Sequence, residues 1–150
     1  MATWGAFAAA VPDLAAFGAA RLGVRPSYLA TADADGWPRV HPVTPIVGRD
    51  DLFLFMEPTS PKGRDLEQRR TYALHNGVPD NAGSGGEFWV RGTAERAEDP
   101  AIRALAASAA AYEPADRYVL FRLTVDEARA GGYGDIALPT TTRWRDDTRE

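Results

Sequence analysis

Residues 57–66 read EPTSPKGRDL, and the rest of the chain is organised around this stretch. The apolar run just before it, residues 52–56 (LFLFM), is typical of a buried strand. Ser60 is a favourable helix N-cap and Pro61 suits the first helical position, so a helix is expected to begin here. A strand that leads into a capped helix presents free backbone N–H groups at the positive end of the helix dipole. Such a terminus favours a bound anion.

Two cationic side chains follow the expected helix start. Lys62 and Arg64 stand in the first turn, where a helix by itself prefers acidic residues. Lys62 is also the only lysine among the chain's 17 basic residues, so it is not explained by background composition. A phosphate held between these cations explains the pattern. A capped surface helix with solvated charges explains it as well.

Length, charge and composition narrow the class of protein. A chain of 150 residues corresponds to one domain, with helices expected over 1–23 and a tail over 131–150. The net charge of −4 argues against a nucleic-acid or anionic-membrane binder. The absence of cysteine excludes disulfides and thiolate metal sites. No apolar run reaches membrane-spanning length and no basic leader precedes the first alanines, so we expect a cytoplasmic protein.

Apolar periodicity and turn signals predict a mainly β (α+β) fold. About six strands follow one another in hairpin order, with three or four helices between them, which indicates a meandering antiparallel sheet closed as a small barrel. The second strand carries three prolines, so it is either an edge strand or faces a ligand. The expected helices are 4–11, 12–23, 60–70 and 99–112, and the expected strands are 27–32, 37–47, 52–56, 71–75, 87–97 and 117–125.

The side chains offer no catalytic set. The two histidines, His41 and His75, are far apart in sequence and belong to no metal-binding motif. No Gly-x-Ser-x-Gly occurs, so the nucleophile elbow of a serine hydrolase is absent. An anion site beside an interrupted strand, without catalytic side chains, suits a protein whose cofactor performs the chemistry.

Four segments together resemble the pyridoxamine 5'-phosphate oxidase-like flavin-binding split-barrel family. They are residues 28–31 (YLAT), 35–43 (DGWPRVHPV), 59–66 (TSPKGRDL) and 72–75 (YALH). The likeness covers about residues 4–125 and is sharpest over 28–75. It implies a six-stranded antiparallel split β-barrel with flanking helices. It also implies a homodimer that binds a flavin or deazaflavin in two symmetric clefts at the interface.

The resemblance also implies which residues hold the cofactor. In that family the Ser-x-Lys segment binds the cofactor phosphate, which here corresponds to Ser60 and Lys62, with Thr59 and Gly63 beside them. The main chain of the interrupted strand bonds the edge of the flavin ring, and Val43 and Thr44 match those positions.

The chain departs from the family pattern at two phosphate-site positions and in its tail. His41 stands where the true oxidases have a phosphate-binding arginine, and Pro61 replaces a basic residue, so Arg64 or Arg39 is expected to compensate. The tail segment around Trp144 differs from that of the true oxidases, so vitamin B6 oxidation is not implied. Trp144 either covers the flavin of the opposite subunit or anchors the tail.

These observations favour an oxidoreductase that uses FMN or a deazaflavin coenzyme to transfer a hydride to or from a small organic substrate. A deazaflavin carries an acidic tail that needs a basic groove, which Arg64, Arg69 and Arg70 either line or leave as a solvated face. FMN is therefore slightly favoured. The alternative is a non-enzymatic flavin or haem/tetrapyrrole-binding carrier or stress-linked sensor, with His41 or His75 as axial ligand. A scaffold that has lost its cofactor is a third possibility.

Overall fold

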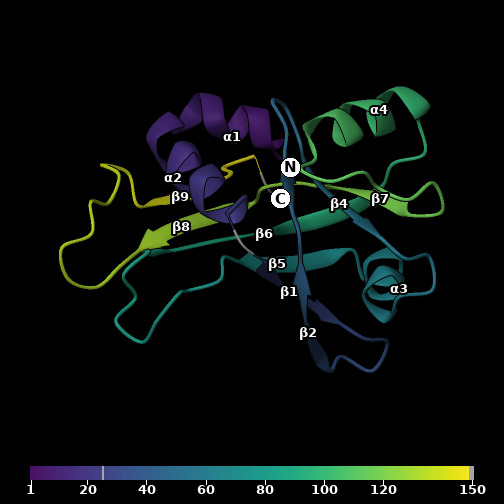
Figure 1. Cartoon of the computed structure of the whole chain (residues 1–150), viewed down its shortest axis with the longest axis horizontal. Coiled ribbons are helices and arrows are strands. Elements are labelled where there is room, and N and C mark those ends of the chain that lie inside the picture. The colour runs from purple at the N-terminus through teal and green to yellow at the C-terminus, as the bar shows by residue number, and fades with distance from the viewer. Residues whose placement is uncertain (25, 149–150) are drawn as a thin grey trace.

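The computed structural model describes residues 1–24 and 26–148. Most of these residues belong to an antiparallel sheet with helices against it (Figure 1). The helices are α1 (Trp4–Ala10), α2 (Pro12–Leu22), α3 (Pro61–Gln68) and α4 (Pro100–Ala109). The strands are β1 (Ser27–Ala32), β2 (Pro38–Val43), β3 (Ile46–Val47), β4 (Leu52–Met56), β5 (Thr71–His75), β6 (Glu87–Arg96), β7 (Val119–Leu123), β8 (Glu127–Gly131) and β9 (Arg143–Arg145).

The strand order confirms an antiparallel sheet but corrects the predicted number of strands. The main path runs β2-β1-β5-β6-β7-β4-β3, while β8 pairs with β6 and with β9. The described residues thus form nine strands, where the sequence predicted six. The predicted strand 37–47 is divided into β2 and β3, and the tail that was expected to be a loop contributes β9. Because β8 (EARAG) has no apolar alternation, only its pairing with β6 and β9 reveals it as a strand.

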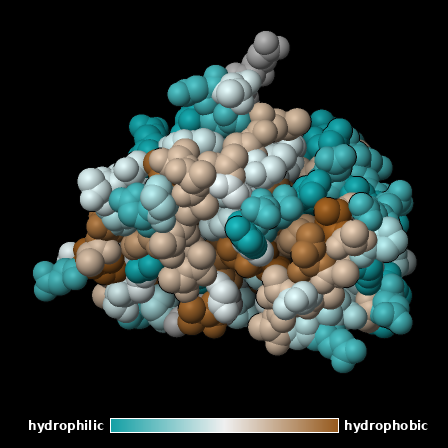
Figure 2. Space-filling model, turned by 90° about the horizontal axis from the view of Figure 1, so that it is seen from above, coloured by the Kyte–Doolittle hydropathy of each residue, from teal (hydrophilic) through white to brown (hydrophobic). Residues whose placement is uncertain are grey.

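Side-chain caps begin three of the helices, and the cap at Ser60 is the one predicted above. Thr3 caps α1 by accepting a hydrogen bond from the Ala6 amide, Asp99 caps α4 through the Ala101 amide, and Ser60 caps α3. α1, α2 and α4 lie above the sheet in Figure 1 and α3 lies at one end of it. Seen from above, this helical side exposes hydrophobic residues in small groups between polar ones (Figure 2). None of the helices in the described part of the chain is long and apolar enough to cross a membrane.

The core fills the space between α1–α2 and the inner face of the sheet. Trp4 and Phe7 pack edge to face, with ring centroids 5.1 Å apart, and Phe88 of β6 lies 6.3 Å from Trp4. α2 approaches β6 most closely at Gly18, where a Cβ atom would lie 2.5 Å from the Phe88 ring. A second, smaller core lies under α4 and contains Ile46, Phe53, Phe55, Ala106 and Leu120.

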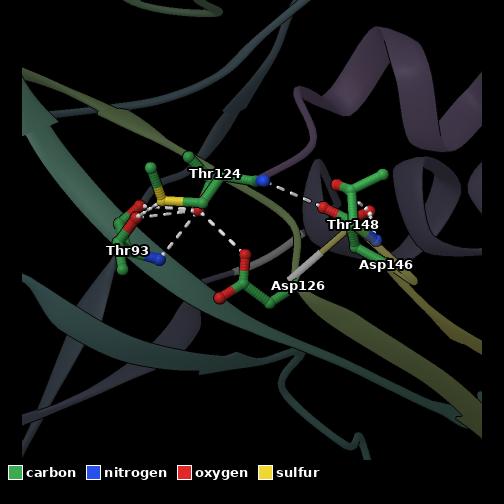
Figure 3. A network of polar contacts seen from close by, with 6 residues as sticks. Thr93, Thr124, Asp126, Asp146 and Thr148 are labelled. Carbon is green, nitrogen blue, oxygen red and sulfur yellow. Dashed lines mark hydrogen bonds and ion pairs between the residues drawn. The ribbon is translucent and has the colours of Figure 1, made fainter. Parts of the chain in front are cut away.

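β6 changes its neighbour along one edge from β8 to β7. It pairs with β8 over residues 87–91 and with β7 over residues 94–96, while β5 pairs with its other edge. Between these two pairings the Thr93 amide donates to Thr124 Oγ1 over 2.9 Å, within the polar network of Figure 3. A Cβ atom at Gly92 would lie 2.3 Å from the Thr124 carbonyl oxygen, so only glycine allows the β7–β8 connection to approach β6 this closely.

Candidate functional site

The edge strand β2 is joined to α3 by a buried carboxylate. Asp65 of α3 is 4% exposed, and its Oδ2 accepts hydrogen bonds from Thr31 Oγ1 over 2.7 Å and from Arg39 Nε over 2.9 Å. Thr31 belongs to β1 and Arg39 to β2, so this single carboxylate fixes the helix against both strands. We call the surface between β2 and α3 the β2–α3 seam.

The start of α3 is capped as the sequence predicted, with Ser60 as N-cap and Pro61 as the first helical residue. Ser60 Oγ accepts the Gly63 amide over 3.2 Å, and the Ser60 carbonyl accepts the Arg64 amide over 3.3 Å. Pro61 has no N–H. Within the described chain, the Lys62 N–H is therefore the first-turn donor that the cap leaves unused.

Gly63 and Thr59 shape this turn. A Cβ atom at Gly63 would lie 3.0 Å from Ser60 Oγ and 3.3 Å from Met56 Sδ, so a larger residue would displace the cap. The Thr59 carbonyl accepts a hydrogen bond from Arg64 Nη2 over 3.3 Å. Arg64 is exposed, and its guanidinium is thereby held beside the turn.

A cavity of about 300 Å³ opens beside the start of α3. It lies where the ends of β2 and β4 meet without pairing to each other. Of the predicted site residues, Val43, Thr44 and Lys62 line it together. The full lining is Pro42, Val43, Thr44, Phe55, Met56, Glu57, Lys62, Tyr112 and Tyr118. An apolar and aromatic wall with a cation at one end suits a flat ligand that carries an anionic group.

Two tyrosines and an ion pair complete the rim of this cavity, and sequence reasoning missed all of them as site residues. Tyr112 follows α4 and Tyr118 precedes β7, so the connection between these elements brings both rings to the site. Arg117 makes a two-pronged ion pair with Glu57, at 2.6 Å for the closer contact, and its guanidinium lies 5.2 Å from the Tyr118 ring centre. The only sequence signal was the pair of tyrosines flanking one short connection.

His41 lies on the seam beside the cavity, with a buried nitrogen that has no partner. Its Nε2 atom makes no hydrogen bond within the described residues. Burial lowers the pKa of His41, and the positive charges of Lys62 and Arg39 lower it further, against the opposing charge of Asp65. The imidazole of His41 is therefore harder to protonate than that of a free histidine.

The structure separates Trp144 from the other predicted site residues. Trp144 lies on β9 opposite Ala128 of β8, and its ring centroid is 5.2 Å from that of Phe7 in α1. Within one subunit it therefore anchors the tail to the core. Whether it also covers a flavin of a second subunit stays a prediction.

Neither of the two arginines that directly follow α3 lines the cavity. The guanidinium of Arg69 donates to the Ala34 carbonyl and that of Arg70 to the Ala94 carbonyl. Both carbonyls belong to neighbouring backbone, in the β1–β2 hairpin and in β6. Arg69 and Arg70 thus serve local structure, while Arg64 remains beside the site.

The opposite face of the sheet has its own apolar hollow. A cavity of about 390 Å³ lies over β2, β1, β5 and β6, lined by Tyr28, Ala30, Val40, Ala73, Leu74, His75, Trp89 and Arg91. Tyr28 is 49% exposed and Val40 is 63% exposed. Both nitrogens of His75 are engaged here, Nδ1 with the Asn76 carbonyl and Nε2 with Glu87 Oε2 at 3.2 Å. We call this surface the outer sheet face.

Comparison with known proteins connects this arrangement to a family. The family model described as pyridoxamine 5'-phosphate oxidase matches residues 19–130. The chain belongs to this family. The match includes β1–β2, the Ser60-capped helix and β6, so the resemblance inferred from the four sequence segments is confirmed.

Solved structures with the same fold include proteins of different described roles. A haem-binding protein from Mycobacterium smegmatis has 24% identity and a TM-score of 0.63, covering 87% of this chain and 55% of its own. The present chain thus spans about half the length of that protein. A NimC/NimA family protein from Clostridium acetobutylicum has 18% identity and a TM-score of 0.61, covering 83% and 86%. The haem storage protein HutZ from Vibrio cholerae has 17% identity and a TM-score of 0.59, covering 82% and 95%.

At these sequence identities the solved structures show that the fold is shared, but they do not indicate which ligand this chain binds. A search of the curated proteins found no match to the chain. The choice of cofactor therefore depends on the site itself.

Proposed function

We propose that the chain binds FMN and acts as a flavin-dependent oxidoreductase on a small organic substrate. The observation that carries this proposal is the Ser60-capped start of α3, where the cap leaves the Lys62 N–H unused within the described chain and Lys62 lines the cavity at the end of β2. A phosphate monoester needs such an arrangement of donors and positive charge.

The remaining residues of the site fit the other parts of FMN. Val43 is the last residue of β2 that pairs with β1, and Thr44 lies beyond the ladder, so backbone groups of Thr44 are available to a ring edge. Phe55 and Met56 give an apolar wall against which a flat ring system can pack. FMN, when bound, supplies the hydride chemistry, and these side chains bind and orient it.

The arginines favour FMN over a deazaflavin coenzyme. An acidic tail would need further cations beside the phosphate site, and Arg69 and Arg70, each of which donates to a backbone carbonyl, do not line the cavity. Arg64 alone is a weaker attraction for several carboxylates. The deazaflavin coenzyme is therefore our second candidate cofactor.

We further propose that the protein is a homodimer through the outer sheet face. In a single subunit this face exposes Tyr28 and Val40 over an apolar hollow, on the side of the sheet away from α1 and α2. Contiguous exposed apolar surface of this kind marks an interaction site. A second copy pairing with this face would bury it and bring a second chain close to β2.

The test is a titration of the purified protein with FMN, followed by flavin fluorescence and by absorbance after desalting. Lys62→Ala is expected to weaken binding by at least about tenfold, since a charge-assisted phosphate contact contributes about 1.5–3 kcal/mol. Lys62→Arg should retain most of the affinity. Arg96→Ala removes an exposed cation of β6 and should leave binding unchanged.

The same titration with a deazaflavin coenzyme separates the two cofactors. Retention of the deazaflavin alone would replace FMN in the proposal. Failure of the wild-type protein to retain either compound at micromolar concentration would overturn the oxidoreductase proposal.

Haem binding is the second candidate function, and one observation favours it. His41 Nε2 is buried and unpartnered in the described chain, whereas both nitrogens of His75 are already engaged. If the protein binds haem, His41 is the expected axial ligand, and His41→Ala should abolish the Soret shift while His75→Ala should not. A haem titration of the wild-type protein without any Soret shift would remove this candidate.

A further inference from the structure

We propose that His41 is a proton-accepting member of the phosphate site, so that binding of a phosphate monoester takes up a proton from solvent at His41 Nε2. This inference rests on the proposed function, because it concerns the same site. It goes beyond that function by making cofactor affinity depend on pH through one side chain of this chain.

The first step of the argument is the position of His41 on the seam. Alternate residues of a strand face the same side, so His41 and Arg39 share the face of β2 that meets α3. Arg39 is hydrogen-bonded to Asp65. His41 lies two residues further along the strand, about 7 Å from Arg39. On α3 the residue one turn before Asp65 is Lys62, which has the same helical face. His41 therefore lies near the start of α3.

The second step is the balance of charge around the imidazole. The charged groups that act on His41 are Lys62 and Asp65 of α3 and Arg39 of β2. Asp65 is ion-paired with Arg39, so the two largely offset one another. Within the described residues Lys62 forms no ion pair, and its positive charge acts on a His41 Nε2 atom that is buried and has no hydrogen-bond partner there. Without an anion, a second positive charge on His41 is disfavoured.

The third step is the effect of a bound phosphate. Above pH 7 a phosphate monoester carries close to two negative charges, since its second pKa is about 6. Beside Lys62 this dianion reverses the balance of charge and favours the imidazolium. The proton taken from solvent forms an Nε2–H bond, which donates to a phosphate oxygen and gives the unpartnered nitrogen its hydrogen bond.

A histidine at this position behaves differently from an arginine. An arginine is always charged, so its contribution does not change with pH in the physiological range. With His41, the affinity for FMN is expected to fall as pH rises from 7.0 to 8.5. Because one proton is taken up, linkage limits the change in FMN affinity to about tenfold per pH unit. We expect the affinity to fall by at least about threefold over this range.

The experiment is calorimetric titration of the full chain with FMN at pH 7.0 and 8.5, in buffers with different ionisation enthalpies. The dependence of the observed heat on the buffer gives the number of protons taken up. The wild-type protein and His75→Gln are expected to show net uptake and weaker binding at pH 8.5. His41→Gln and His41→Arg are expected to show no uptake and little pH dependence, with His41→Arg the tighter of the two.

Riboflavin, which lacks the phosphate, is the matched ligand and is expected to bind without proton uptake. Proton uptake with FMN that persists in His41→Gln, or that disappears in His75→Gln, would overturn the role of His41 and leave FMN binding intact. Failure of FMN to bind the wild-type protein at either pH would instead overturn the proposed function.

Discussion

Asp65 stabilises the seam more than the other acidic residue of α3 does, because it is buried. Its carboxylate accepts two hydrogen bonds, and Glu67 forms only an exposed ion pair with Arg96 at 3.0 Å. Exposed ion pairs contribute about 0–1 kcal/mol to the free energy of unfolding. When a buried carboxylate loses its charge, its hydrogen-bond donors are left without a good acceptor, which costs about 1–3 kcal/mol. The two carboxylates thus provide a matched comparison on one helix.

We predict that Asp65→Asn lowers the free energy of unfolding by about 1–3 kcal/mol, since Arg39 loses its ionic partner. Glu67→Gln should change it by less than about 0.5 kcal/mol. Urea unfolding of both variants measures the difference. Equal and small effects would mean that Asp65 does not fix α3 to β2.

Trp144 allows a second prediction at the residue scale. Trp144→Ala removes a ring that packs on Phe7 and should cost about 2 kcal/mol of unfolding free energy, less than for a fully buried tryptophan. If the tail anchor is its whole role, the folded variant will bind FMN as tightly as the wild type. The control is Trp37→Ala, since Trp37 is 72% exposed in the β1–β2 hairpin. A weaker FMN affinity confined to Trp144→Ala would instead support cover of a flavin.

At the scale of elements, the contact between α2 and β6 depends on the absence of a side chain at Gly18. Alanine normally stabilises a helix interior by about 1 kcal/mol relative to glycine. Here the added Cβ would lie 2.5 Å from the ring of Phe88, which is fully buried and held by Trp4. The steric cost should exceed the gain in helix propensity.

We therefore predict that Gly18→Ala destabilises the protein by about 1–3 kcal/mol. Gly23→Ala is the control, because the backbone there is right-handed (φ −91°) and the nearest atom to a Cβ is 3.6 Å away. Thermal and urea unfolding measure the stability of both variants. The change in unfolding free energy should differ between them in sign or clearly in size. A stabilised Gly18→Ala would show that α2 can shift away from β6.

Elements with local signals were predictable from the sequence, and elements defined by pairing were not. The α3 cap follows from Ser60 and Pro61, and β4 follows from the apolar run over residues 52–56. Strands β3, β8 and β9 are short or lack apolar alternation, so their existence depends on neighbours far along the chain. The same holds for the site. Lys62 and Ser60 are readable as a motif, but the rim tyrosines and the link between Arg39 and Asp65 require the folded chain.

At the scale of the whole molecule, the proposed dimer can be tested by placing a charge on the outer sheet face and, as a control, on an equally exposed apolar residue elsewhere. Val40 on β2 is 63% exposed and Leu105 on α4 is 61% exposed. If the outer sheet face is the interface, Val40→Glu should dissociate the dimer and Leu105→Glu should not, because a buried unpaired carboxylate is costly. Light scattering coupled to size exclusion measures the mass of each. A monomeric wild-type protein, or equal behaviour of the two variants, would contradict the interface.

The position of β6 between β5 on one edge and β8 and β7 on the other has a consequence for hydrogen exchange. A strand with neighbours on both edges cannot open without breaking two ladders. Amides of β6 should therefore exchange with deuterium only when the whole chain unfolds, and their rates report the global stability. β2 pairs with β1 on one edge and can separate by local opening. A ligand bound at the seam that only closes the edge would slow amide exchange at β2 and leave the rates of β6 unchanged. A ligand that stabilises the entire fold would slow exchange in both strands.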